Sequence, residues 1–253
     1  MSDFKRVLLL GTGPASIQLA LHLKKHWNCT VAIVGRESVR SECFFEALKQ
    51  SNQRIRVSIQ NEKHRYMEGE CFVDHVFQGY GTITGEWDTV IFAVTTDAYI
   101  QVLNQIASKL LEQVNCMLLI SPTFGSNSLV RHYMNDINPD VEIISFSSYF
   151  GDTRWIEDKP TNHVLTTAIK KKVFIGSTKS SSANVVALCT VYEQSGIVMV
   201  RMDSPIEAET RNISLYVHPP LFMNAFALNA IFEDKESKKY VYKIYPEGPI
   251  TQF

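Results

Sequence analysis

The chain has 253 residues, of which 45% are hydrophobic and 20% charged, and its formal net charge is −1 at pH 7. This length and composition are typical of a globular protein with room for one large domain or two modest ones. A net charge so close to zero gives no general attraction for nucleic acid or for an anionic membrane, so we expect neither as a partner.

The first half of the chain alternates short β-branched runs with helix-length segments. Buried strands are predicted at 7–10, 31–34, 90–94, 117–120 and 143–146. Apolar spacing near 3.6 residues predicts helices at 15–27, 38–50, 98–112 and 127–136. Apolar strands separated by helices indicate an α/β fold, a Rossmann-type doubly wound parallel sheet. An inserted hairpin is predicted at 54–77, where the residues alternate like an antiparallel pair.

The pattern changes after residue 148, where SSYFGDTRWIEDKPTNHV is polar and aromatic without a clear period. Beyond it we predict a strand at 173–175, a helix at 182–194 and a strand at 197–202. We therefore expect a first domain at 1–180, with its boundary anywhere between 148 and 200. The remainder, 181–253, would complete that domain and begin a second one.

A glycine-rich turn joins the first predicted strand to the first helix, and its residues are Gly11, Thr12, Gly13, Pro14, Ala15 and Ser16. The first glycine permits the tight turn, and the second lets backbone N–H groups approach a pyrophosphate at the helix N-terminus. Ser16 stands at the third position of the GxGxxG pattern and is small enough for close helix–strand packing. The order strand, turn, helix favours dinucleotide binding over a tight turn without a ligand.

The second strand ends in Gly35–Arg36, where chains that bind NAD usually carry an acidic residue for the ribose hydroxyls. A guanidinium pairs with a 2′-phosphate, and Ser38 and Arg40 add donors nearby, so we predict NADPH as the cofactor. An exposed surface arginine is the alternative interpretation of Arg36.

Two later strands end in small hydroxyl residues, in AVTTDAY and ISPTFGS. Ligands of doubly wound sheets lie at the carboxyl ends of the strands, so Thr95 and Pro122, with their neighbours, are predicted to border the nicotinamide half of the cofactor. Ordinary strand-to-helix caps would explain these residues equally well.

His218 lies in SLYVHPPLFMN, between an apolar run and two prolines. Proline disfavours helix in the residue before it, so His218 is expected to be extended, just before a helix that starts at Pro219 or Pro220. A rigid imidazole at a helix entrance is either a placed acid–base group or a cap bonded to the backbone.

Targeting, membrane and disulfide signals are not seen. MSDFKR runs directly into an apolar strand, which is unlike a secretory leader, and no stretch approaches the ~20 apolar residues of a membrane span. The five cysteines are scattered without CxxC or Cys/His metal-ligand spacing. These features predict a cytoplasmic protein with reduced thiols and no metal site.

Six long stretches carry a family resemblance: GTGPASIQLA, IVGRES, ISPTFGS, IISFSSYFGDTR, NHVLTTAIKKKVFIGST and AETRNISLYVHPPLFMN. They resemble the opine-metallophore dehydrogenases, which are the staphylopine-type synthases within the wider opine dehydrogenase family. The resemblance covers essentially the whole chain, and the motifs between 143 and 224 are more specific than the glycine turn. It implies an NADP-binding Rossmann-type domain followed by the start of a catalytic domain.

The resemblance also implies a reaction. Family members condense the primary amine of a histidine-derived aminobutyrate intermediate with a 2-oxo acid and reduce the imine with NADPH. His218 matches the proposed catalytic histidine of the family, and Asp152 matches an acidic position of its active site. Arg154, Arg211 and Asn212 lie in the matching motifs and are candidates for binding substrate carboxylates, although salt bridges within the fold explain them equally well.

Asp152 carries a prediction about the 2-oxo acid. It is expected at the end of a polar loop that enters the cleft, where a second substrate carboxylate would meet a like charge. At ~4–5 Å and an effective dielectric constant of about 20 this repulsion is on the order of 3–4 kcal/mol, which favours pyruvate over 2-oxoglutarate. If Asp152 points away from the cleft, it only supports the loop.

The family's members are longer, with a helical C-terminal portion that closes over the substrate and helps to form a homodimer, so the chain resembles a truncated member. Two other functions therefore stay open. One is a related dehydrogenase that condenses an ordinary amino acid with a 2-oxo acid. The other is an NADPH-binding fragment without turnover.

Overall fold

The computed structural model describes residues 4–157, 159–213 and 215–216. The chain divides after Glu209 into two compact units. The first unit contains all the strands described below.

The first unit is built on an eight-stranded sheet, here called the main sheet, in the order β12-β11-β8-β7-β6-β1-β2-β5. Neighbouring strands are parallel except for the antiparallel pair β8–β11. Its strands are β1 (Arg6–Leu10), β2 (Thr30–Gly35), β5 (His75–Gln78), β6 (Thr89–Phe92), β7 (Cys116–Leu119), β8 (Glu142–Phe146), β11 (Lys172–Ser177) and β12 (Val198–Met202). A parallel sheet with fully apolar central strands requires cover on both faces.

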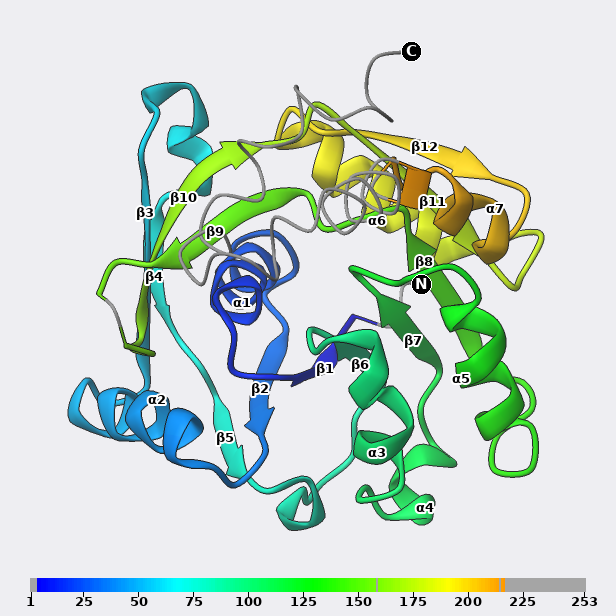
Figure 1. The fold of residues 1–253 in the computed structure, drawn as a ribbon, viewed down its shortest axis with the longest axis horizontal. Coiled ribbons are helices and arrows are strands. Elements are labelled where there is room, and N and C mark those ends of the chain that lie inside the picture. Colours follow the sequence, from blue (N-terminus) through cyan, green and yellow to red (C-terminus); the bar gives the residue numbers. More distant parts are fainter. Residues whose placement is uncertain (1–3, 158, 214, 217–253) are drawn as a thin grey trace, which may run out of the picture. The chain divides into compact units, whose positions relative to one another are not determined.

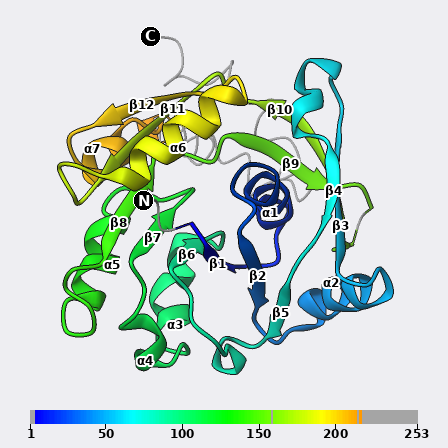
Figure 2. The same ribbon diagram turned by 180° about the vertical axis from the view of Figure 1, so that it is seen from behind.

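Helices provide that cover, as Figures 1 and 2 show. Alternate residues of β1 belong to different hydrophobic clusters, with Val7 and Leu9 in one and Leu8 and Leu10 in the other. The first cluster takes in α1 (Pro14–Trp27), α2 (Val39–Gln50) and α6 (Ala183–Gln194). The second takes in α3 (Tyr99–Leu103), α4 (Ser108–Leu111) and α5 (Ser126–Met134). The predicted doubly wound α/β fold is therefore confirmed.

A second, four-stranded sheet, here called the small sheet, has the order β4-β3-β10-β9. Its strands are β3 (Arg54–Ile59), β4 (Gly69–Phe72), β9 (Gly151–Trp155) and β10 (His163–Ile169). Helix α1 contacts β3, β9 and β10 as well as β1 and β2, so it lies between the two sheets (Figure 1). The remaining elements are short: η1 (Glu62–Met67), η2 (Tyr80–Thr82), η3 (Thr96–Ala98) and α7 (Pro205–Thr210).

Three sequence-based predictions differ from this architecture. The helix expected at 98–112 is wrong, because Asn104 ends α3 and a turn separates it from α4. The hairpin expected at 54–77 is correct for β3 and β4, but β5 returns to pair parallel with β2. The aperiodic stretch after residue 148 contains β9 and the start of β10, which pair with each other, and β10 also pairs with the distant β3.

Gln18, a buried residue of α1, joins this helix to the small sheet. Its side-chain carbonyl accepts hydrogen bonds from the hydroxyls of Thr153, at 2.8 Å, and Tyr149, at 2.9 Å, while its amide donates to the hydroxyl of Thr166. A Cβ atom at Gly151 would lie on this amide, so β9 approaches α1 closely only because glycine stands there. The network fixes the face that β9 turns toward the helix.

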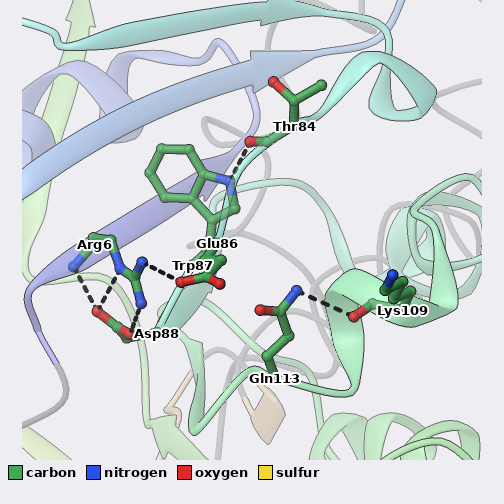
Figure 3. Close-up of polar contacts among 7 residues, drawn as sticks. All are labelled: Arg6, Thr84, Glu86, Trp87, Asp88, Lys109 and Gln113. Atoms are coloured by element: carbon green, nitrogen blue, oxygen red, sulfur yellow. Dashed lines mark hydrogen bonds and ion pairs between the residues drawn. The ribbon is translucent and has the colours of Figure 1, made fainter.

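An ion-pair cluster lies at the amino ends of two central strands of the main sheet, at the start of β1 and just before β6 (Figure 3). The guanidinium of Arg6 donates to Asp88 at 2.9 Å and to Glu86 at 2.7 Å, and the Arg6 backbone N–H donates to Asp88 at 3.0 Å. The indole N–H of Trp87 donates to the Thr84 carbonyl at 3.0 Å. These contacts tie β1 to the segment before β6, at the amino ends of both strands.

The stability of the fold is expected to depend on pH because of the buried residue His22. Its ring is 2% exposed and stacks on Tyr192 at 4.7 Å between centroids, beside His26 and Phe150. Burial, and then the charges of His26 and Lys25, lower the pKa of His22 to about 3. Between pH ~6.5 and about pH 3 the unfolded chain therefore binds a proton at this position that the folded chain excludes. As the pH is lowered through this window, the free energy of unfolding decreases by up to ~1.4 kcal/mol per pH unit.

We expect His22→Phe, which keeps a ring in the cluster, to remove this slope in urea unfolding measured between about pH 7 and pH 5. Tyr192→Phe removes a hydroxyl from the same cluster but no group that titrates in this window, so its slope should match that of the unmodified chain. Equal slopes for His22→Phe and the unmodified chain would contradict the prediction.

Candidate functional site

The carboxyl ends of β1, β2 and β6 surround a cavity of about 370 Å³, here called the first cavity. It is lined by the turn after β1, the start of α2 and the segment after β6. Among its residues are Gly11, Thr12, Gly13, Gly35, Arg36, Ser38, Arg40, Tyr80, Thr95, Asp97, Gln101, Trp155 and Pro160. Seven of the predicted cofactor residues, Thr95 among them, therefore meet at one site, although they come from segments far apart in the sequence.

Gly11 makes the tight turn possible. Its φ of +122° is unfavourable for residues with a side chain, and a Cβ atom there would lie 2.6 Å from the carbonyl oxygen of Ala93. The Gly11 N–H donates to the Val34 carbonyl at 2.7 Å. The turn therefore lies directly against the ends of β2 and β6.

The N-terminus of α1 opens into this space. Gly13 is the N-cap, no side chain caps the helix, and the first turn has no acidic residue. A Cβ atom added at Gly13 would have no neighbour within 4 Å among the described residues. The hydroxyl of Ser16 is buried and has no partner in the described part of the chain. Backbone N–H groups and a helix dipole directed into open space suit an anionic phosphate.

Two arginines lie on the far side of the first cavity, at the end of β2. Arg36 and Arg40 are both exposed, and no described side chain is paired with either guanidinium. Ser38 has a different contact, because its hydroxyl caps α2 by accepting from the Ser41 N–H at 3.3 Å. Burial raises the pKa of Tyr80, while the nearby Arg36 charge opposes that rise. The cavity thus pairs a helix N-terminus with two unpaired cations.

A second cavity of about 760 Å³ adjoins the first. Ala93, Val94, Thr95 and Asp97 line both cavities, and the second is otherwise lined by Ala15, Thr96, Ile120, Ser121, Thr123, Leu129 and Tyr149. Its lining is mostly apolar and hydroxyl side chains, which suits the nicotinamide half of a dinucleotide. The first cavity, with its cations, suits the phosphorylated adenosine half.

Sequence reasoning missed Tyr149 and Asp97. The single proton of the Tyr149 hydroxyl is shared between the Ala15 carbonyl, at 3.1 Å, and the Gln18 side-chain carbonyl, at 2.9 Å. Burial raises the pKa of Tyr149 well above the usual range, so the hydroxyl stays protonated. Tyr149 follows β8, and Asp97 follows β6, at the carboxyl ends of both strands. The rule that ligands lie at these ends would have identified both.

Three predicted cofactor residues do not line either cavity as described. Pro14 is the first residue of α1, Ser16 is buried in its first turn, and Pro122 is buried between two residues that do line the second cavity. These three residues therefore help to shape the turns, and their own side chains do not border either cavity.

Asp152 is not on a loop, so that expectation is wrong. It lies in β9, where Thr153 faces α1 and Asp152 faces the opposite, outer side of the small sheet. Its carboxylate pairs with Arg154 at 3.1 Å and accepts from the Thr167 hydroxyl at 2.8 Å, and these bonds lower its pKa. Neither Asp152 nor Arg154 is among the described residues that line the two cavities; Trp155, at the end of the strand, is.

The other candidates lie beyond the first unit. His218 is outside the described residues. Arg211 and Asn212 belong to the second compact unit, where Arg211 is exposed and Asn212 half-buried.

Within the described part of the chain, no three His, Cys, Asp or Glu side chains are grouped so as to hold a metal ion. The helices described there include none with the length and apolar character of a bilayer span.

Curated proteins with similar sequences include a staphylopine synthase and a pseudopaline synthase. The chain is 45% identical to staphylopine synthase of Staphylococcus aureus over 250 residues, which cover 97% of this chain and 57% of that protein. It is 32% identical to pseudopaline synthase of Pseudomonas aeruginosa, over 97% of this chain and 56% of that protein. The chain thus spans a little over half the length of the curated relatives it matches.

The fold is shared with a solved enzyme structure. Yersinopine dehydrogenase with NADP⁺ bound superposes with a TM-score of 0.83 at 29% identity, over 91% of this chain and 55% of that one. The family described as staphylopine dehydrogenase matches residues 5–253. Since this match extends over nearly all of the sequence, the chain belongs to the staphylopine dehydrogenase family.

Proposed function

We propose that the chain is the NADPH-binding part of an opine metallophore synthase. In this reaction a 2-oxo acid condenses with the primary amine of a histidine-derived aminobutyrate intermediate, and the imine is reduced. The observation that carries the proposal is the pair of adjoining cavities, with a helix N-terminus and two unpaired arginines on one side and an apolar lining on the other. Family membership and the similarity to staphylopine synthase support it.

The described residues fit NADPH. The N–H groups at the start of α1 would hold the pyrophosphate, Arg36 and Arg40 the 2′-phosphate, and Thr95, Ser121 and Thr123 the nicotinamide half. The bound NADP⁺ of yersinopine dehydrogenase supports this choice of nucleotide. When bound, the cofactor supplies the hydride that reduces the imine carbon.

The protein's own part in the chemistry concerns protons and orientation. Condensation forms a C–N bond and releases one water, so a proton must leave the ammonium and reach the departing hydroxyl. An imidazole with a pKa near neutrality can perform both transfers, and we assign them to His218. Asp152 is proposed to orient or stabilise that imidazolium, and Arg211 and Asn212 to bind substrate carboxylates. Arg154 is a weaker candidate because its guanidinium is paired with Asp152.

Pyruvate is the proposed 2-oxo acid, and the preference is assigned to the charge of Asp97 instead of that of Asp152. Asp152 lines neither described cavity and pairs with Arg154 on the outer face of the small sheet, so the preference is not assigned to its charge. Asp97 is exposed and lines both cavities. Its carboxylate would disfavour the second carboxylate of 2-oxoglutarate near the nicotinamide half.

Two further features belong to the proposal. The full-length enzyme is proposed to be a homodimer that works in the cytoplasm.

The proposal is tested by following NADPH oxidation with pyruvate and the aminobutyrate intermediate, each alone and together. We expect the chain to bind NADPH and a full-length enzyme to oxidise it only when both substrates are present. Turnover with an ordinary amino acid in place of the intermediate would indicate a different opine dehydrogenase. No NADPH binding would overturn the proposal.

A further inference from the structure

Glu209, in α7, is 0% exposed. Its carboxylate accepts four hydrogen bonds, from the N–H of Gly125 at 2.8 Å, the N–H of Asn127 at 2.9 Å, the side-chain amide of Asn127 at 2.8 Å and the hydroxyl of Ser145 at 2.9 Å. No Lys, Arg or His of the described residues forms an ion pair with it. A buried carboxylate is costly unless donors satisfy it, so these four bonds hold their donors firmly in place.

One donor, Gly125, ends the segment that borders the second cavity, Asn127 lies in the first turn of α5, and Ser145 lies in β8. Residues 121–125 connect β7 to α5, and Ser121 and Thr123 line the cavity. From the cavity side, Thr123 donates its N–H to the hydroxyls of Ser126, at 2.9 Å, and Thr96, at 3.3 Å. On the side away from the cavity, the backbone N–H groups of Gly125 and Asn127 donate to Glu209, and no other described side chain accepts from them. Glu209 acts as an N-terminal cap supplied by a distant helix.

We propose that Glu209 is a positioning residue for the nicotinamide half of the site. It sets the position of the 121–125 segment, and therefore of the Ser121 and Thr123 groups that border the second cavity. This inference rests on the proposed function, because it takes the second cavity to be the nicotinamide half. The partners of Glu209 line neither cavity themselves, but Ser121 and Thr123 of the adjoining segment line the second cavity, and no residue of 121–125 lines the first, where Arg36 lies.

Glu142 offers a matched control. It is another buried carboxylate, 2% exposed, and it accepts from the hydroxyl of Ser177 and from the side-chain amide of Asn184 at 2.8 Å. It stands at the first residue of β8, the amino edge of that strand, whereas Ser145 lies near the carboxyl end. A change from carboxylate to amide at either position puts an N–H₂ group among buried donors. Only the change at Glu209 disturbs the 121–125 segment.

The experiment compares the affinity of Glu209→Gln, Glu142→Gln and the unmodified chain for two ligands. NADPH fills both cavities, while adenosine 2′,5′-bisphosphate carries the 2′-phosphate and adenosine but no nicotinamide. We expect Glu209→Gln to raise the Kd for NADPH roughly five- to tenfold and the Kd for the bisphosphate less than about twofold. Glu142→Gln should change neither Kd by more than about twofold, although both variants lose thermal stability.

If Glu209→Gln raises the Kd for both ligands equally, or if both variants change the Kd values equally, the inference is overturned. Glu209 would then contribute only to the stability of the fold. If the unmodified chain binds neither ligand, the proposed function itself fails. If Glu209→Gln does not fold, Ser145→Ala removes one donor and keeps the charge. It should raise the Kd for NADPH about two- to threefold without changing that for the bisphosphate, and an unchanged ratio would overturn the inference.

Discussion

Replacement of His218 by alanine in the full-length enzyme is expected to lower kcat by roughly 10²–10⁴, the usual contribution of a positioned acid–base group. The reason lies in the sequence VHPP, since the two prolines restrict the backbone around a single imidazole. Condensation requires two proton transfers at the amine, and no other histidine of the sequence stands in such a setting. NADPH affinity should be almost unchanged, because every predicted phosphate contact is made by other residues.

The control for His218→Ala is His163→Ala. His163 is half-buried in β10, and its ring Nε2 lies 2.8 Å from the hydroxyl of Ser58, so its loss also removes an imidazole and a hydrogen bond. Steady-state kinetics of both variants with saturating pyruvate and intermediate should separate the two roles. Near-normal turnover in His218→Ala would make His218 a helix cap. A loss in both variants of similar size would indicate destabilisation of the fold rather than proton transfer.

The main sheet could be predicted because each central strand carries its own evidence. Leu8 and Leu10 pack on one face and Val7 and Leu9 on the other, so an unbroken apolar run is what a strand buried on both sides requires. Helices α1, α2, α5 and α6 were predicted to within one or two residues for a similar reason, since each has a periodic apolar face or a clear cap.

The hairpin of β3 and β4 could be predicted from its alternation, but the assembly of the small sheet could not, because it is not local. Strand β10 pairs with β3, which is about a hundred residues earlier in the chain, and the stretch that holds β9 and the start of β10 has no clear period. The prediction of a cleft-entering loop at Asp152 failed for this reason. The side chain that faces α1 is set by Gln18, and nothing near Asp152 in the sequence points to that contact.

The candidate site follows the same division. Gly11, Gly13 and Arg36 could be predicted because the strand–turn–helix order fixes what lies at the end of the next strand. Glu209 could not be assigned a role in this way, because its position depends on donors more than sixty residues away in sequence.

The second large effect is expected at Arg36, which we predict determines the preference for NADPH over NADH. Its guanidinium is exposed at the rim of the first cavity and is not paired with a described carboxylate, so it can bind a 2′-phosphate without first breaking an ion pair. Gly35, just before it, lies so close to Thr12 that a Cβ atom there would clash with the Thr12 methyl group. The end of β2 is thereby held against the glycine turn, which places Arg36 beside the adenosine half of the site.

We therefore expect the chain to bind NADPH more tightly than NADH by at least ~1.5–3 kcal/mol, roughly ten- to 150-fold in Kd. Arg36→Ala should remove most of this preference and leave NADH affinity similar, because NADH has no 2′-phosphate. Arg36→Lys should keep part of it, since an ammonium is a point charge without the bidentate fork.

Arg131→Ala is the control, because it removes an equal charge from the exposed side of α5. It should leave the preference intact, which separates a direct contact from the net charge of the chain. Fluorescence titration of all four proteins with both nucleotides provides the measurement, and equal affinity of the unmodified chain for NADPH and NADH would refute the assignment.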